Sequence, residues 1–269
     1  MLATYWNAMR ETFSRRVALV LLGVAAVVSV AFNWLVGIQT AANGTHAMVV
    51  GTQPPAPAAI AVPAVLESEL HTTGTLWLLL ATFAAAPLLA GTLEKGWFEL
   101  LFSKGTARWR IFCGRFLAGL TLYALTFAIA AFPLALRLWW RTGIATWEVG
   151  TALLIQTFSF AALLAVTALV TLPQKGVALP IIATAGIWVL SPLLANRQEA
   201  FYRILSSHVA REVVDWIYRI LPKCTELENL CAALIQGGAV GSWWPIWSTG
   251  VFTLCVFGMT LWLLERKSF

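Results

Sequence analysis

The residues with the most chemical information lie between positions 94 and 115, and their types favour protein binding over catalysis. Charged side chains occur there beside large apolar ones at helical spacing, so a short helix would carry an apolar side with a charged rim. Such a surface offers a partner protein both an anchor and a means of setting its register. The residues concerned are Glu94, Lys95, Trp97, Glu99, Leu100 and Leu101.

A second helix is predicted directly after the first. Gly105 is well placed to end the first helix, and Thr106 can cap the second. The second helix begins with three basic residues, from Arg108 to Arg115, and continues into an apolar stretch. We call residues 94–115 the elbow. An alternative interpretation is that the elbow only lies on the inner leaflet, with its tryptophans among the lipid headgroups.

Neither the histidines nor the cysteines indicate a catalytic or metal site. His46, His71 and His208 are far apart in the sequence and lie outside the apolar stretches, as solvent-facing loop residues do. The cysteines show no C-x-x-C spacing of the kind that binds zinc. Cys224 and Cys231 would lie roughly 10 Å apart on a continuous helix, so a disulfide between them requires a break in that helix.

The loop that binds the phosphates of ATP is also missing. Gly91 and Gly96 have the spacing of the glycines in that motif, but Trp97 follows where the motif requires lysine. We therefore expect this chain to bind no cofactor and to hydrolyse nothing. If ATP provides the energy, a separate polypeptide must use it.

The elements that hold these residues are membrane helices. Of the 269 residues, 59% are hydrophobic and 11% are charged, which is far from the composition of a soluble domain. Six stretches without Asp, Glu, Lys or Arg are long enough to cross a bilayer. We predict an all-α polytopic membrane protein, a single transmembrane domain over residues 1–269. Its spans cover residues 17–38, 75–93, 116–136, 149–172, 176–195 and 247–264.

The first two connecting segments have different patterns. In residues 1–16, apolar and polar side chains recur at helical spacing, which predicts an amphipathic helix at the membrane interface. Residues 39–74 contain prolines and neither Lys nor Arg, which favours a loose external loop without a further helix.

Residues 196–246 are predicted to stay on the outer side of the membrane. An amphipathic pattern over residues 201–220 should lie along the interface until Pro222 ends it. The apolar stretch at 230–240 is too short to cross a bilayer, so we expect a re-entrant or interface-packed helix there. A seventh span is the less favoured alternative.

The distribution of positive charge predicts the orientation. Most of the 18 Lys and Arg residues fall on the side that carries both termini, which places the N- and C-termini in the cytoplasm. Arg137 and Arg141 fall on the other side, where they flank Trp139 and Trp140 as snorkelling residues of an aromatic belt. Because the positive charges lie at the ends of spans, nucleic acid is not an expected partner.

Polar side chains inside the spans are few. Asn33, Gln156 and Ser159 either line a translocation path or, as we favour, hydrogen-bond neighbouring helices. The six spans contain no carboxylate and no lysine, which disfavours an ion-driven secondary transporter and a membrane-embedded enzyme. Glu67 and Glu69 precede the second span, where they either meet substrate at an external mouth or form the solvated start of a helix.

The elbow resembles the corresponding loop in the membrane subunits of ABC exporters of the ABC-2 type. That loop carries Glu, Gly, a second Glu, paired leucines and Ser before a basic turn. In the same order this sequence has Glu94, Gly96, Glu99, Leu100, Leu101, Ser103 and Arg108. The resemblance extends in outline to the N-terminal interface helix, the six spans and the external segment after the fifth span. The sequence departs from this pattern at Gly105, where many relatives have proline, and at Trp97 and Phe98, where smaller or polar residues are common.

The resemblance implies that the elbow is a coupling helix, with Lys95 and Trp97 completing its contact surface. A coupling helix sits in a groove of a separate ATPase subunit and passes ATP-driven closure to the spans. The chain would then be the permease subunit of an exporter in the bacterial cytoplasmic (inner) membrane, surrounded by lipid. It would pair with a second permease copy or a close paralogue. A non-transporting membrane scaffold or assembly protein is the alternative.

Overall fold

The structure, a computed structural model, describes residues 2–14, 16–40, 46–50, 56–90, 107–173, 176–204, 207–238 and 241–266. Six helices in these ranges are long and apolar enough to cross a membrane, so the predicted all-α polytopic architecture is confirmed. They are α2 (Arg16–Leu35), α3 (Ala58–Ala90), α5 (Arg108–Thr142), α6 (Glu148–Thr171), α7 (Ala178–Ala195) and α11 (Trp244–Arg266). Four further helices are α1 (Leu2–Ser14), α8 (Arg197–Ala200), α9 (His208–Ile220) and α10 (Cys224–Ile235).

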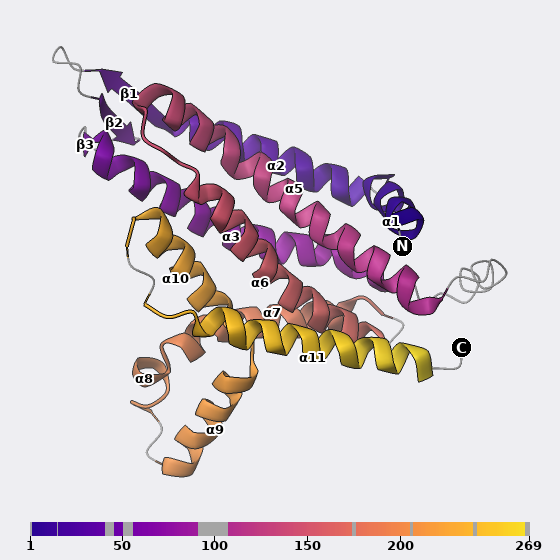
Figure 1. Ribbon diagram of the computed structural model, residues 1–269. Helices are drawn as coiled ribbons and strands as arrows, with labels where there is room; N and C mark the ends of the chain where they lie inside the picture. The colour runs from indigo at the N-terminus through magenta and orange to yellow at the C-terminus, as the bar shows by residue number, and fades with distance from the viewer. Residues whose placement is uncertain are drawn as a thin grey trace.

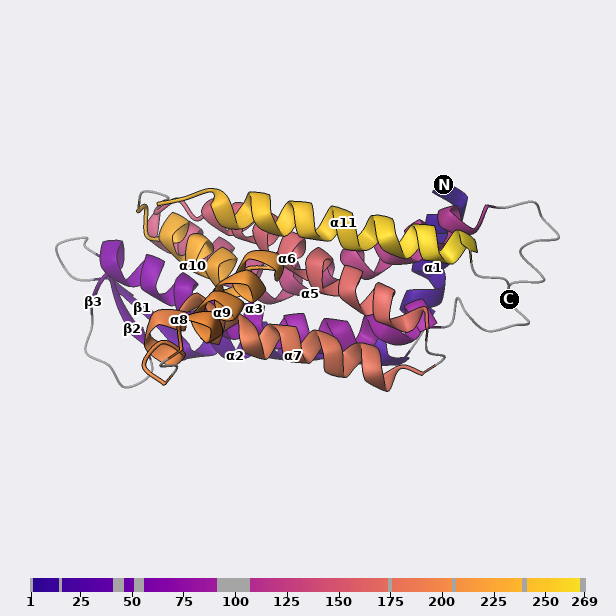
Figure 2. The same ribbon diagram turned by 90° about the horizontal axis from the view of Figure 1, so that it is seen from below.

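The six long helices run beside one another in an elongated bundle (Figure 1). The helix α1 and the last turns of α11 lie at one end of the bundle, which we call the terminal end (Figures 1 and 2). A small antiparallel sheet of β1 (Val36–Thr40), β2 (His46–Val50) and β3 (Ala56–Pro57) lies at the opposite end, the sheet end. This arrangement agrees with six spans that bring the chain back to the side on which it started.

The core of the bundle is built around α5 and α6. The helix α5 packs against α1, α2 and α3, while α6 packs against α7, α10 and α11. The two groups meet where α5 and α3 contact α6, and there Tyr123 stacks on Phe160 with ring centroids 4.5 Å apart. The outer helices α2, α7 and α11 leave much of their apolar surface exposed, which suits contact with lipid or with another membrane protein.

The predicted loose loop after the first span is wrong in its first part. The helix α2 ends at Leu35, so residues 36–38 leave the predicted span and form β1 together with residues 39 and 40. This strand pairs with β2 from Val36 opposite Val50 to Thr40 opposite His46. Val36 and Met48 are buried, because alternate side chains of a strand point to one face. That short alternation was overlooked beside the longer helical patterns.

The second span begins 17 residues earlier than predicted, because α3 starts at Ala58 rather than at residue 75. The prolines in this region predict extended backbone, but α3 includes Pro63 in its second turn and forgoes the one backbone hydrogen bond that an N–H at this position would donate. The buried side chains of Val62, Leu66 and Leu70 recur at helical spacing and hold this part of α3 against the bundle.

The third span is also longer than predicted. The helix α5 runs through the predicted span 116–136 and includes the basic end of the elbow. Its N-cap residue is Ala107, without a side-chain cap, so the predicted Thr106 cap is wrong. At its other end Gly143 adopts φ 70°, a conformation that favours glycine, and donates to the carbonyl of Trp139. The remaining spans, 149–172, 176–195 and 247–264, match α6, α7 and α11 within three residues at each end.

Between α7 and α11 the described residues form helices, none of which is long enough to be a seventh span. The helix α9 ends at Ile220, just before Pro222, as the sequence predicts. The next helix, α10, has 12 residues, too few to cross a bilayer, and it packs against α6 and α3. Cys224 and Cys231 lie on this one continuous helix and are both free thiols.

Candidate functional site

Most of the elbow lies outside the described residues. This applies to eight of the residues expected to contact an ATPase: Glu94, Lys95, Gly96, Trp97, Glu99, Leu100, Leu101 and Ser103. Arg108, the ninth, is the first residue of α5. The two helices that flank the elbow, α3 and α5, pack along each other up to the terminal end (Figure 1). The structure therefore defines the frame that carries the elbow.

Arg115 joins three helices in that frame. Its guanidinium donates to the carboxylate of Glu11 on α1, with 2.8 Å between Nη2 and Oε2, and to the carbonyl of Leu88 on α3 at 2.9 Å. The side chain of Arg115 is only 2% exposed. A buried ion pair of this kind stabilises the fold when its charged groups are satisfied by hydrogen bonds. We call this three-helix contact the Arg115 junction.

The helix α1 lies unusually close to α5 beside this junction. A Cβ atom added to Gly114 would stand 3.1 Å from the backbone carbon of Thr4, so only glycine fits there without displacement. The hydroxyls of Tyr5 and Thr121 are 2.9 Å apart, which adds a polar contact between the same two helices. Leu2 and Trp6 point away from the protein, as expected for an interface helix with an apolar outer face.

Of the three polar residues considered for a substrate path, Gln156 and Ser159 lie one turn apart on α6, whereas Asn33 lies on α2. Asn33 donates to the carbonyl of Ser29 on its own helix, and its backbone carbonyl accepts a hydrogen bond from Arg137. Arg137 thereby binds the C-terminal end of α2, where a helix dipole favours a cation. Ser159 is buried on α6 and faces Cys224 on α10. Burial raises the pKa of Cys224 to about 11, and Ser159 has a smaller effect that lowers this pKa. Gln156 lines a cavity.

That cavity has a volume of about 270 Å³ and lies between α3, α6 and α10. We call it the α10 cavity. Nδ1 of His71 is 3.1 Å from Oε1 of Glu228 at its edge, and Gln236 donates to the carboxylate of Glu67. Among the described residues, no three His, Cys, Asp or Glu side chains are placed to hold a metal ion. The cavity is lined by Glu67, Leu70, His71, Gln156, Glu228, Asn229, Cys231, Ala232 and Ile235.

Glu69 has a different environment from its neighbours on α3. The prediction of a solvated helix start is wrong for this residue, because Glu69 is 0% exposed. Neither of its carboxylate oxygens has a hydrogen-bond partner among the described residues. The second span therefore contains a carboxylate, because α3 begins at Ala58 and not at residue 75. A buried carboxylate without a partner is rare and costly, and such groups often have a function.

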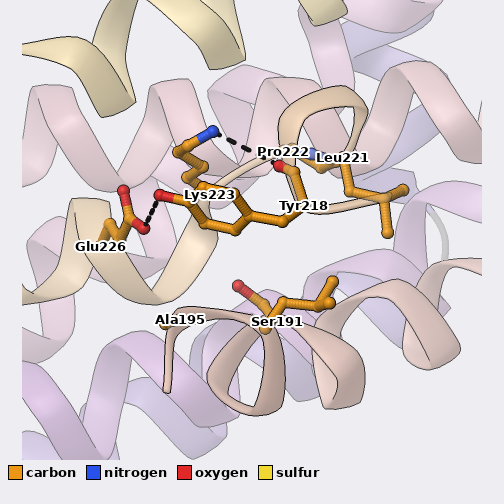
Figure 3. Close-up of a pocket in the computed structure, with 8 residues that line it drawn as sticks. Ser191, Ala195, Tyr218, Leu221, Pro222, Lys223 and Glu226 are labelled. Atoms are coloured by element: carbon orange, nitrogen blue, oxygen red, sulfur yellow. Dashed lines mark hydrogen bonds between the residues drawn. The ribbon is translucent and has the colours of Figure 1, made fainter. Parts of the chain in front are cut away.

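A polar junction that the sequence did not predict connects α9 with α7 and α10 (Figure 3). The backbone N–H of Lys223 also donates to the hydroxyl of Thr249 on α11. The hydroxyl of Tyr218 donates to Glu226, and Nζ of Lys223 lies 3.4 Å from the carbonyl of Tyr218 and 4.1 Å from its ring centroid. Burial and Glu226 together raise the pKa of Tyr218 to about 12. The cleft beside these residues has a volume of about 10 Å³, room for one water molecule at most. We therefore assign it a structural role.

This junction holds α9 by one edge only. Arg197 pairs with Asp215 at 2.8 Å and lies 3.9 Å above the ring of Tyr218. The opposite side of α9 carries apolar residues that no other described element covers, and Figure 1 shows α9 projecting from the bundle. The predicted amphipathic character is confirmed for α9, but the helix begins at His208, and residues 201–204 of the predicted pattern form turns. Its exposed apolar residues are Val209, Val213, Trp216, Ile217 and Ile220.

No family model matches the chain, and no curated protein matches it. The resemblance to ABC-2 permeases therefore depends on the elbow motif and on the order of the elements around it.

Proposed function

We propose that this chain is the membrane-spanning permease subunit of an ATP-driven ABC exporter of the ABC-2 type, with its ATPase on a separate polypeptide. The elbow motif between the second and third spans suggests this function. The Arg115 junction is the structural observation that supports it best. It ties α1, α3 and α5 together at the terminal end, where both helices that flank the elbow emerge.

A mechanism follows from this frame. An ATPase that binds the elbow and closes on ATP would push on the adjoining ends of α3 and α5. Because Arg115 connects these helices with each other and with α1, the three would move as one group rather than bend separately. The central position of α5 would carry the movement to α6, and so change the access to a path between the two sides.

The same proposal gives partners and a location. The exposed apolar faces of α2, α7 and α11 would contact lipid and a second permease copy or paralogue. The terminal end, with both termini, would face the cytoplasm of a bacterium, and the sheet end would lie outside. This chain would bind no ATP, and hydrolysis would take place in the partner.

Co-purification of an ATPase tests the proposal. The tagged chain is purified from its own host in a mild detergent, next to a Glu94→Lys, Glu99→Lys variant. A Glu199→Lys, Glu212→Lys variant is the matched control, because both residues are exposed and distant from the elbow. We expect a nucleotide-binding protein with the wild type and the control, reduced at least about tenfold in the elbow variant. A wild-type preparation without such a protein would contradict the proposal and favour a scaffold.

The burial of Glu69 favours one other function, an ion-driven carrier. A carboxylate inside a membrane helix is the group that such carriers use to couple ions to substrate. The test uses liposomes that contain the purified chain alone, with an imposed pH gradient and ethidium as the probe. The carrier function would be supported if ethidium accumulates, if Glu69→Gln abolishes this accumulation and if Glu265→Gln leaves it intact. If the gradient drives no accumulation, the carrier function is excluded.

A further inference from the structure

The α10 cavity has the size and lining of a small-molecule site. Its volume of about 270 Å³ is close to the lower limit for ligand pockets. Leu70, Ala232 and Ile235 provide apolar wall, while the polar residues come from three different helices. A ligand there would contact α3, α6 and α10 at once.

The charge of the lining is one-sided. Glu67 and Glu228 contribute two carboxylates, and neither lysine nor arginine is among the residues that line the cavity. His71 is the only lining residue that can carry a positive charge, and its side chain is 73% exposed at the edge. Clefts lined by one sign of charge and bordered by apolar walls concentrate ions of the opposite sign. The lining therefore favours a cation.

Gln156 provides an independent indication of a ligand. Its side chain lines the cavity although the residue is only 3% exposed, and its amide makes no hydrogen bond to another described residue. A Cβ atom added to Gly74 would lie 3.0 Å from Nε2 of Gln156, so the two helices enclose the amide closely. The amide therefore faces the cavity without a partner from the described part of the protein, and a bound molecule with a hydrogen-bond donor would provide one.

We propose that the α10 cavity binds a small organic cation, a primary amine carried on a short apolar chain. The ammonium group would donate hydrogen bonds to the carbonyl oxygen of Gln156 and be attracted by Glu67 and Glu228. The methylene groups would lie against Leu70 and Ile235. A bare metal ion does not fit, because no group of three metal-binding side chains is present among the described residues. This site goes beyond the permease function and does not depend on it.

Isothermal titration calorimetry of the purified chain in an uncharged detergent tests the site. The probe is 1,4-diaminobutane. Two controls have the same four-carbon chain: 1,4-butanediol, which is uncharged, and succinate, which is negatively charged. We expect the diamine to bind and the diol and succinate to show no binding. Equal heats for the diamine and the diol, or no heat from the diamine, would overturn the proposal, and this comparison needs no variant.

Variants assign the binding to this cavity. Glu67→Gln with Glu228→Gln keeps the shape of the lining and removes its charge, so diamine affinity should fall by more than about tenfold. Gln156→Leu should lower it about tenfold through the lost acceptor. The matched control, Glu199→Gln with Glu212→Gln, should bind as the wild type does. Undiminished binding by the folded cavity variants would place the amine elsewhere and overturn the assignment.

Discussion

The environment of Arg115 in the structure differs from the one that its position in the sequence predicts. It stands among basic residues at the start of a span, where positive charges generally lie in water on the cytoplasmic side. The structure instead buries it between Glu11 and Leu88. No sequence pattern indicates this, because Glu11 is 104 residues away and only the packing of α1 on α5 brings the two together.

Replacement of Arg115 is predicted to destabilise the protein. Arg115→Ala leaves Glu11 and the Leu88 carbonyl without this donor, so the free energy of unfolding should fall by roughly 3 kcal/mol. Arg115→Lys should lose less, because lysine retains the charge but lacks the guanidinium fork. Unfolding in detergent measures this, with Arg110→Ala as the exposed control. Equal stability of Arg115→Ala and Arg110→Ala would contradict the junction.

Tyr218 gives a prediction that depends on pH. Its pKa, raised to about 12 from the usual 10, means that the folded state holds the phenolic proton more tightly than the unfolded state. This stabilisation is complete below pH 10 and is lost as the pH rises toward 12. Tyr218→Phe should therefore cost about 1 kcal/mol at pH 8 through its lost hydrogen bond. The difference in thermal unfolding temperature between Tyr218→Phe and the wild type should become smaller between pH 10 and 12. A difference that stays constant over this range would contradict the prediction.

At the scale of elements, the long spans could be predicted and the short segments could not. Twenty apolar residues without charge have few alternatives to a membrane helix, which is why α6, α7 and α11 matched closely. The strands β1 and β2 have five residues each and are stabilised by pairing with each other, while β2 also packs against α3. The early start of α3 also depends on tertiary packing, which outweighs the preference of Pro63 for extended backbone.

The close approach of α1 to α5 can be tested at Gly114. Gly114→Val places atoms about where the backbone of Thr4 lies, so α1 should detach and trypsin should cleave after Arg10 more than about fivefold faster. Gly150→Val is the matched control, because nothing lies within 4 Å of a Cβ atom at that position. Equal cleavage of the two variants would show that α1 is not held against α5 at this point.

The exposed face of α9 is predicted to lie in the membrane interface. With Cys113 and Cys255 replaced by alanine, a cysteine at Val213 is labelled with an environment-sensitive fluorophore, and the control carries it at Glu212. In liposomes the label at 213 should shift to shorter wavelength than the label at 212, because only the apolar face of α9 contacts lipid. Identical spectra from the two positions would place α9 in water.

At the scale of the whole molecule, the bundle consists of two groups of helices joined at α5 and α6. The elbow belongs to the first group, and the α10 cavity lies where the second group meets α3. The sequence predicted Gln156 as a polar residue of interest, but it could not predict the cavity. Glu67, Gln156 and Glu228 come from separate helices, and their meeting depends on how α10 folds back onto α6.

The central claim is that the elbow contacts an ATPase. A photo-reactive amino acid at position 97, in the elbow, is irradiated in cells of the native host, with the same residue at position 140, near the sheet end, as the control. Captured proteins are identified by mass spectrometry. The account predicts a nucleotide-binding ATPase at position 97 and not at 140; capture of lipid alone at 97, or of the same proteins at both positions, would contradict it.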